Sequence, residues 1–98
     1  MAIKSFKDKL TEAVNYGQTN KQTRKLLPAE LHQKARIKLA VLGAATNLND
    51  FLELRGNRFE ALKGDRRGQY SIRINDQYRI CFEWRNNDAY EVEITDYH

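Results

Sequence analysis

The second half of the chain alternates between apolar and polar side chains, which is the period of a β-strand with one buried face. The alternation stops at Asn75-Asp76-Gln77 and again over residues 85–88, where turn-forming side chains gather. It therefore predicts three strands joined by short turns into an antiparallel meander. The predicted apolar face carries Tyr70, Ile72, Ile74, Tyr78, Ile80, Phe82, Trp84, Tyr90, Val92 and Ile94.

The other face of this meander is predicted to be polar, charged and free of helical cover. It consists of Ser71, Arg73, Arg79, Cys81, Glu83, Glu91, Glu93 and Thr95. Cys81 is the single cysteine of the chain, which excludes an internal disulfide and fits a reducing compartment. Because it lies inside a strand pattern, it is expected to be a packing residue and not a nucleophile.

The first half of the chain contains a predicted amphipathic helix over residues 28–45. Pro28 suits the first helical position, where a missing N–H costs nothing. The apolar side chains recur at spacings of three and four residues, and a second set widens the stripe: Leu31, Ala35, Leu39 and Leu42, then Ile37, Val41 and Ala44. His32 also lies on this helix and is expected at its surface or edge.

Shorter elements complete the pattern. A helix is predicted over residues 8–16, with Gly17 as its stop, and the polar and basic residues 18–25 are expected to form a loop. Short strands are predicted at residues 3–6 and 59–62.

These elements predict one α+β domain over residues 1–98, since a chain of 98 residues supports a single core. An N-terminal strand and a helical hairpin are expected to pack on one face of a twisted antiparallel sheet. The net charge of +4 favours an anionic partner such as nucleic acid, although it also serves solubility. No apolar run approaches the roughly 20 residues that span a bilayer, so no membrane partner and a cytoplasmic location are expected.

Two arginines stand out on the polar face, because Arg73 and Arg79 lie on adjacent predicted strands and point the same way. They could form cross-strand ion pairs with the glutamates of that face. Alternatively, rigid strands could hold both guanidinium groups as a clamp for a phosphate, where they would stabilise charge that develops during its transfer.

A basic segment between two glycines precedes the meander. It contains Lys63, Arg66 and Arg67, and it matches no nucleotide-binding fingerprint. It is either a solvated hairpin loop or the rim of a groove that contacts an RNA backbone.

The chain closes with Asp96-Tyr97-His98, three side chains that can hold or move a proton. RNA hydrolysis without a metal needs a base for the 2′-hydroxyl, an acid for the leaving 5′-oxygen, and cations for the phosphate. The terminal tripeptide with Lys63 and Arg79 supplies all three kinds of group, although such a tripeptide can also be a frayed tail. His32 and His98 are far apart and no Cys/His cluster has ligand spacing, so no metal or cofactor is expected.

The chain resembles the HigB branch of the RelE toxin superfamily in its opening Ile3-Lys4-Ser5-Phe6 and in four later motifs that follow one another in a fixed order. The motifs are Leu62-Lys63-Gly64-Asp65-Arg66-Arg67-Gly68, Tyr70-Ser71-Ile72-Arg73-Ile74-Asn75, Tyr78-Arg79-Ile80-Cys81-Phe82 and Asp96-Tyr97-His98. The resemblance implies the RelE-like microbial RNase fold and a toxin that cleaves messenger RNA on the ribosome. It also implies a HigA-type helix-turn-helix antitoxin, through which alone the toxin would reach operator DNA.

Residue by residue, the resemblance implies a catalytic group of Lys63, Arg79, Asp96, Tyr97 and His98. Lys63 and Arg79 would be the phosphate-stabilising cations, and Arg73 an RNA contact like Arg66 and Arg67 of the basic segment. Some members of the family carry a histidine where this chain has Glu60. The proton carrier is therefore either Glu60 or His98, or cleavage is weak.

Strand parity bears on the end of the chain. Asp96 and His98 share the parity of Val92 and Ile94, so continued alternation would point them toward the helices. A bulge, or a strand that ends by Ile94, is expected to release them.

Two other functions fit the same resemblance. The ParE branch of the superfamily inhibits DNA gyrase by contact and lacks the catalytic set. A degenerate toxin would only hold its antitoxin on DNA.

Overall fold

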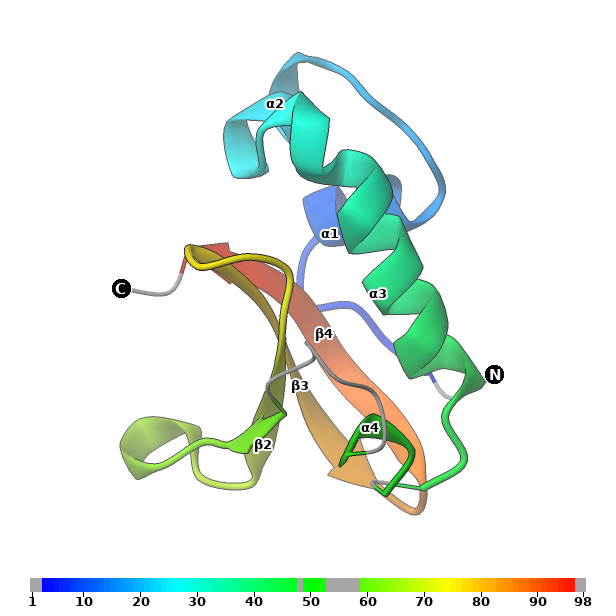
Figure 1. Ribbon diagram of the computed structural model, residues 1–98, viewed down its shortest axis with the longest axis vertical. Coiled ribbons are helices and arrows are strands. Elements are labelled where there is room, and N and C mark those ends of the chain that lie inside the picture. Colours follow the sequence, from blue (N-terminus) through cyan, green and yellow to red (C-terminus); the bar gives the residue numbers. More distant parts are fainter. Residues whose placement is uncertain (1–2, 48, 53–58, 97–98) are drawn as a thin grey trace.

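The alternating half of the sequence forms an antiparallel sheet in the computed structural model, which describes residues 3–47, 49–52 and 59–96. Helices cover one face of the sheet, as the α+β prediction requires (Figure 1). In chain order the elements are α1 (Lys9–Asn15), α2 (Lys21–Leu26), the 3₁₀ turn η1 (Ala29–Leu31), α3 (His32–Ala44), α4 (Asn49–Leu52), β1 (Glu60–Ala61), the 3₁₀ turn η2 (Gly64–Arg66), β2 (Gln69–Arg73), β3 (Tyr78–Arg85) and β4 (Asp88–Asp96).

The sheet has four strands in the order β1-β2-β3-β4, and all neighbours are antiparallel. Ile72 lies opposite Ile80, which lies opposite Ile94, so three strands place apolar side chains on one face. Asn86 and Asn87 both have positive φ angles, 51° and 63°, and form the two-residue turn between β3 and β4. Such turns match the twist of their strands. The predicted meander is therefore confirmed.

A bulge in β4 corrects the prediction for Tyr90 and Glu91. Cys81 pairs with Glu93, but Glu83 pairs with Tyr90, so β4 has one extra residue there. Glu91 takes a φ of 53° in the bulge. Since one extra residue reverses the parity of the strand, Tyr90 lies on the polar face and not on the apolar one. Its ring is covered by the Arg85 guanidinium at 4.1 Å.

The predicted long helix is confirmed over α3, which begins at His32 after η1. Ala35, Leu39 and Leu42 are fully buried against the sheet. Ile37 was predicted to widen this stripe, which is wrong: it is 55% exposed. It lies two positions from both Ala35 and Leu39, and two positions turn a helix by about 200°.

The expected loop at residues 18–25 contains a helix, α2. Asn20 caps it, because its side chain accepts from the Thr23 N–H at 3.0 Å and its own N–H donates to Thr23 Oγ at 2.8 Å. This reciprocal pair is a capping box with threonine in the third position. The prediction of a loop rested on the polar and basic composition of the segment and did not consider the helix-capping pair Asn20 and Thr23.

His32 is buried, which corrects its expected surface position. Its exposed fraction is 2%, Nε2 donates to the Leu27 carbonyl oxygen at 2.7 Å, and Nδ1 lies 3.2 Å from Thr19 Oγ. The ring therefore joins α3 to the end of α2 and to the loop before it.

Replacing His32 with alanine is expected to lower the free energy of unfolding by about 2 kcal/mol, because the buried Leu27 carbonyl loses its donor. Urea unfolding followed by circular dichroism measures the change. Gln33→Ala alters the exposed neighbouring residue and is expected to stay within about 0.5 kcal/mol of the wild type. Equal effects of the two substitutions would contradict a role for the ring.

The N-terminal segment lies along β4. Ile3 and Phe6 form parallel bridges with Ala89 and Val92, so the predicted strand at residues 3–6 exists only as two isolated pairings. Beyond it, the Ile94 N–H donates to Thr11 Oγ of α1 at 3.0 Å. These contacts cover the outer edge of the sheet, which would otherwise expose unpaired backbone groups. None of the helices in the described part of the chain is long and apolar enough to cross a membrane.

Candidate active site on the open face of the sheet

The face of the sheet that α1 and α3 leave uncovered, called the open face here, collects the polar side chains of all four strands. Cross-strand pairing sets two rows on it. The first row runs Glu60, Ser71, Cys81 and Glu93, and the second runs Arg73, Arg79 and Thr95.

Arg79 is the centre of this arrangement. Its side chain is only 8% exposed, and Nε donates to Ser71 Oγ at 2.8 Å. One terminal nitrogen lies 3.3 Å from Glu60 Oε1. A buried cation needs such partners, and partners on two paired strands fix the plane of the guanidinium group. The sequence pattern placed Ser71 on this face but did not identify it as a partner of Arg79.

Glu60 is the acidic group of the same cluster. β1 pairs with β2 through Glu60 and Ser71, which brings the carboxylate beside Arg79. The Glu60 side chain is 51% exposed, so it can exchange protons with solvent or with a bound molecule. A carboxylate next to a fixed guanidinium can move a proton beside a held phosphate.

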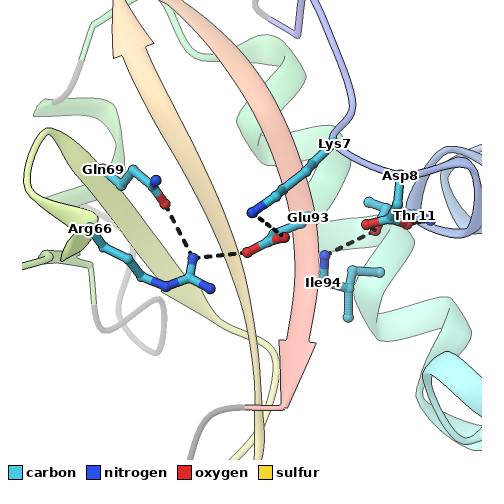
Figure 2. A network of polar contacts seen from close by, with 7 residues as sticks. All are labelled: Lys7, Asp8, Thr11, Arg66, Gln69, Glu93 and Ile94. Carbon is cyan, nitrogen blue, oxygen red and sulfur yellow. Dashed lines mark hydrogen bonds and ion pairs between the residues drawn. The ribbon is translucent and has the colours of Figure 1, made fainter.

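The basic segment is divided by the fold. Gly64 and Gly68 have positive φ angles, 65° and 91°, and delimit the tight turn around η2. Lys63 and Arg67 are exposed. Arg66 instead turns back over the sheet, where it donates to Gln69 Oε1 at 3.2 Å and to Glu93 Oε1 at 2.8 Å (Figure 2).

Cys81 lies fully buried on the open face, between Ser71 and Glu93. Burial raises the pKa of its thiol, with the nearby Glu93 carboxylate adding to the shift. The thiol therefore stays protonated at neutral pH and is a poor nucleophile. This confirms its expected role in packing.

Arg73 extends the positive charge toward the helices. It forms an ion pair with Asp76 in the turn after β2. The pKa of Lys38 on α3 is lowered, first by burial and then by the charges of Lys34 and Arg73. Cations of β2 and α3 therefore lie close enough to repel one another.

Asp96 stands at the last described position of β4. The bulge occurs before Val92 and not after Ile94, and β4 continues to Asp96 opposite Tyr78. Asp96 therefore shares the face of Tyr78, which packs against the core, and the expected release to the other face does not occur. It accepts from Gln77 Nε2 at 3.0 Å. Its neighbour Thr95 lies directly across from Arg79, so the end of β4 is next to the arginine.

Tyr97 and His98 lie outside the described residues. Within residues 3–47, 49–52 and 59–96, no three His, Cys, Asp or Glu side chains are grouped to hold a metal ion. The structure thus gathers Glu60, Ser71 and Arg79 by direct contact. It places Lys63 and Arg67 on the segment that leads into β2.

This fold is shared with YoeB in two solved structures. The structure of the YoeB-YefM complex from Staphylococcus aureus contains a chain that matches with a TM-score of 0.60 at 23% identity, covering 100% of this chain and 99% of that one. The YoeB dimer from the same organism matches with a TM-score of 0.59 at 24% identity, covering 100% and 97%.

Sequence comparisons identify the family to which the chain belongs. Residues 4–98 match the family described as RelE-like toxin of type II toxin-antitoxin system HigB. Toxin HigB-1 of Vibrio cholerae is 40% identical over 79 residues, which are 81% of this chain and 80% of that protein. Endoribonuclease HigB of Proteus vulgaris is 34% identical over 97 residues, 98% and 99% of the two chains. The chain therefore belongs to the HigB-like toxin family of type II toxin–antitoxin systems.

Proposed function

We propose that this toxin is a metal-independent endoribonuclease that cleaves messenger RNA on the ribosome. The observation that carries the proposal is the buried Arg79 guanidinium, held by Ser71 and Glu60 on the open face of the sheet. A cation held in this way is preorganised to stabilise negative charge that develops on a phosphate. The Proteus vulgaris relative named an endoribonuclease supports the same activity.

In the proposed reaction the 2′-hydroxyl oxygen attacks the adjacent phosphorus and the bond to the 5′-oxygen breaks. A base takes the 2′ proton and an acid returns a proton to the leaving oxygen, so the net charge is conserved. Arg79, with Lys63, stabilises the additional negative charge on the phosphorane. Glu60 is the acid or base nearest to Arg79, and His98 supplies the complementary group, with Asp96 and Tyr97 as its neighbours.

RNA binding is proposed for the cations that surround this cluster. Arg67 and Lys63 are exposed on the segment between β1 and β2, and Arg73 lies across from Arg79. Phosphates along a single strand would pass between these charges.

The proposed partner that controls the toxin is a HigA-type helix-turn-helix antitoxin. The type II family of the chain and the YoeB-YefM complex support an antitoxin partner in general. Operator DNA would be reached only through that protein.

The test of the proposed function uses purified toxin, ribosomes and a defined messenger RNA. New 5′ ends within codons are expected only when ribosomes are present. They should carry a 5′-hydroxyl, because transfer to the 2′-oxygen leaves the phosphate on the 3′ side. Polynucleotide kinase would then label the new ends without prior phosphatase treatment.

Three results would count against this proposal. Ends that carry a 5′-phosphate would indicate activation of water, as metal-dependent nucleases perform. Equal cleavage without ribosomes would remove the ribosome from the mechanism. Intact messenger RNA together with inhibited DNA gyrase would place the toxin with the contact inhibitors.

A further inference from the structure

Glu93 forms the centre of a charged network on the open face, and the proposed reaction does not use it. Its side chain is 13% exposed and lies between two cations. Oε1 accepts from Arg66 at 2.8 Å, and Oε2 lies 3.4 Å from Lys7 Nζ (Figure 2). Arg66 in turn donates to Gln69 at 3.2 Å.

The network connects segments that are far apart in the sequence. Lys7 ends the N-terminal segment that lies along β4, and Arg66 belongs to η2, which follows β1 at the opposite edge of the sheet. To reach Glu93, the Arg66 side chain extends toward β4, and buried Cys81 lies across from Glu93 on β3. The contact between Arg66 and Glu93 therefore ties the basic segment of residues 63–68 to the open face.

We propose that Glu93 is a positioning residue, which fixes the basic segment through Arg66 so that Lys63 and Arg67 stand beside the Arg79 cluster. The inference rests on the proposed nuclease function for its effect on rate. Arg66 is accordingly an anchor of the segment, in contrast to the exposed Arg67, which remains available to RNA.

A positioning role for Glu93 and a purely electrostatic role predict opposite effects of Glu93→Gln on the cleavage rate. Glu93→Gln removes a negative charge from an RNA-binding surface, so long-range electrostatics alone predicts tighter RNA binding and no slower cleavage. Positioning predicts a lower kcat, because small displacements of catalytic cations are costly. KM should stay unchanged or fall.

The test compares Glu93→Gln with Glu91→Gln, which makes the same charge change at an exposed residue of the same strand. Glu93→Gln is expected to lower kcat roughly tenfold in the ribosome-dependent assay, whereas Glu91→Gln changes it less than about twofold. Lys7→Gln should fall between them, because the Lys7 side chain is 55% exposed and its contact is longer. Equal kcat values for the folded Glu93 and Glu91 variants would overturn the proposal.

A second readout does not depend on activity. The Arg66 and Arg67 amides donate to the Lys63 and Gly64 carbonyl oxygens within the basic segment. Their hydrogen exchange should accelerate at least fivefold in Glu93→Gln, while amides of β3 remain protected as in the wild type. Unchanged exchange of these two amides would overturn the inference even if the wild-type protein cleaves no RNA. Faster hydrogen exchange throughout the sheet would also count against the inference, since Glu93 would then stabilise the whole fold. Lys7→Gln repeats the test with a milder change in the same network.

Discussion

Replacing Arg79 with lysine is expected to lower the rate of messenger RNA cleavage about 100-fold, although the net charge of the protein is unchanged. Lysine keeps a positive charge but lacks the planar fork that reaches Ser71 and Glu60 at once. The lysine ammonium group could contact only one of these two partners at a time, so a bound phosphate would lose a hydrogen-bond donor held in a fixed position. RNA binding should change less than about threefold, because the phosphate attraction depends mainly on charge.

Arg85→Lys is the matched control. Arg85 lies on the same strand and the same face, but it is exposed, pairs with Glu83 at 3.7 Å and stacks on Tyr90. Its replacement should leave cleavage within about twofold of the wild type. Circular dichroism and thermal unfolding identify the fraction of each variant that is folded. A folded Arg79→Lys protein that cleaves at the wild-type rate would remove the guanidinium from the mechanism.

Replacing Glu60 with glutamine is expected to lower the cleavage rate by about 10²- to 10³-fold if the carboxylate transfers a proton. The free energy of unfolding should change by less than about 1 kcal/mol, because the amide oxygen of glutamine still accepts from Arg79 and the Glu60 side of the pair is half exposed. The two readouts therefore separate a chemical role from a structural one. Single-turnover cleavage on saturating ribosomes and urea unfolding measure them.

Glu83→Gln removes a carboxylate from the same face and serves as the control, with cleavage expected within about twofold of the wild type. Glu60→His should recover a large part of the rate, since imidazole also carries protons. Deletion of His98 tests the other assignment. If Glu60→Gln cleaves normally and the deletion abolishes cleavage, His98 acts without Glu60 and the proposed pairing is wrong.

The sequence predicted most of the fold because the relevant signals are local. Strand alternation, the periodic stripe of α3 and the turn residues each act over a few neighbouring positions. The strands β2, β3 and β4 and the helices α1 and α3 follow from them. The exposed position of Ile37 follows from the same helical period. The prediction was wrong there because it assigned too many positions of the helix to the buried face.

The candidate site was predicted only as a face. Parity placed Arg73 and Arg79 together with the glutamates of the meander, but the observed partners of Arg79 are Glu60 of β1 and Ser71 of β2. The binding of a phosphate by Arg79 stays a prediction. The partners of Arg66 could not be identified, because Glu93 is 27 residues away and side-chain reach over a strand leaves no periodic signal.

The sequence by itself determined which residues alternate and where the chain turns, since these depend on the geometry of adjacent peptide units. Tertiary structure alone decided the bulge in β4. The Glu91 N–H donates to Ser5 Oγ at 2.9 Å, and the Val92 N–H donates to the Ser5 carbonyl oxygen at 3.1 Å. A segment at the other end of the chain thus supports the extra residue that turns Tyr90 onto the open face. Such a contact becomes favourable only when the folded sheet brings both segments together, and no local pattern encodes it.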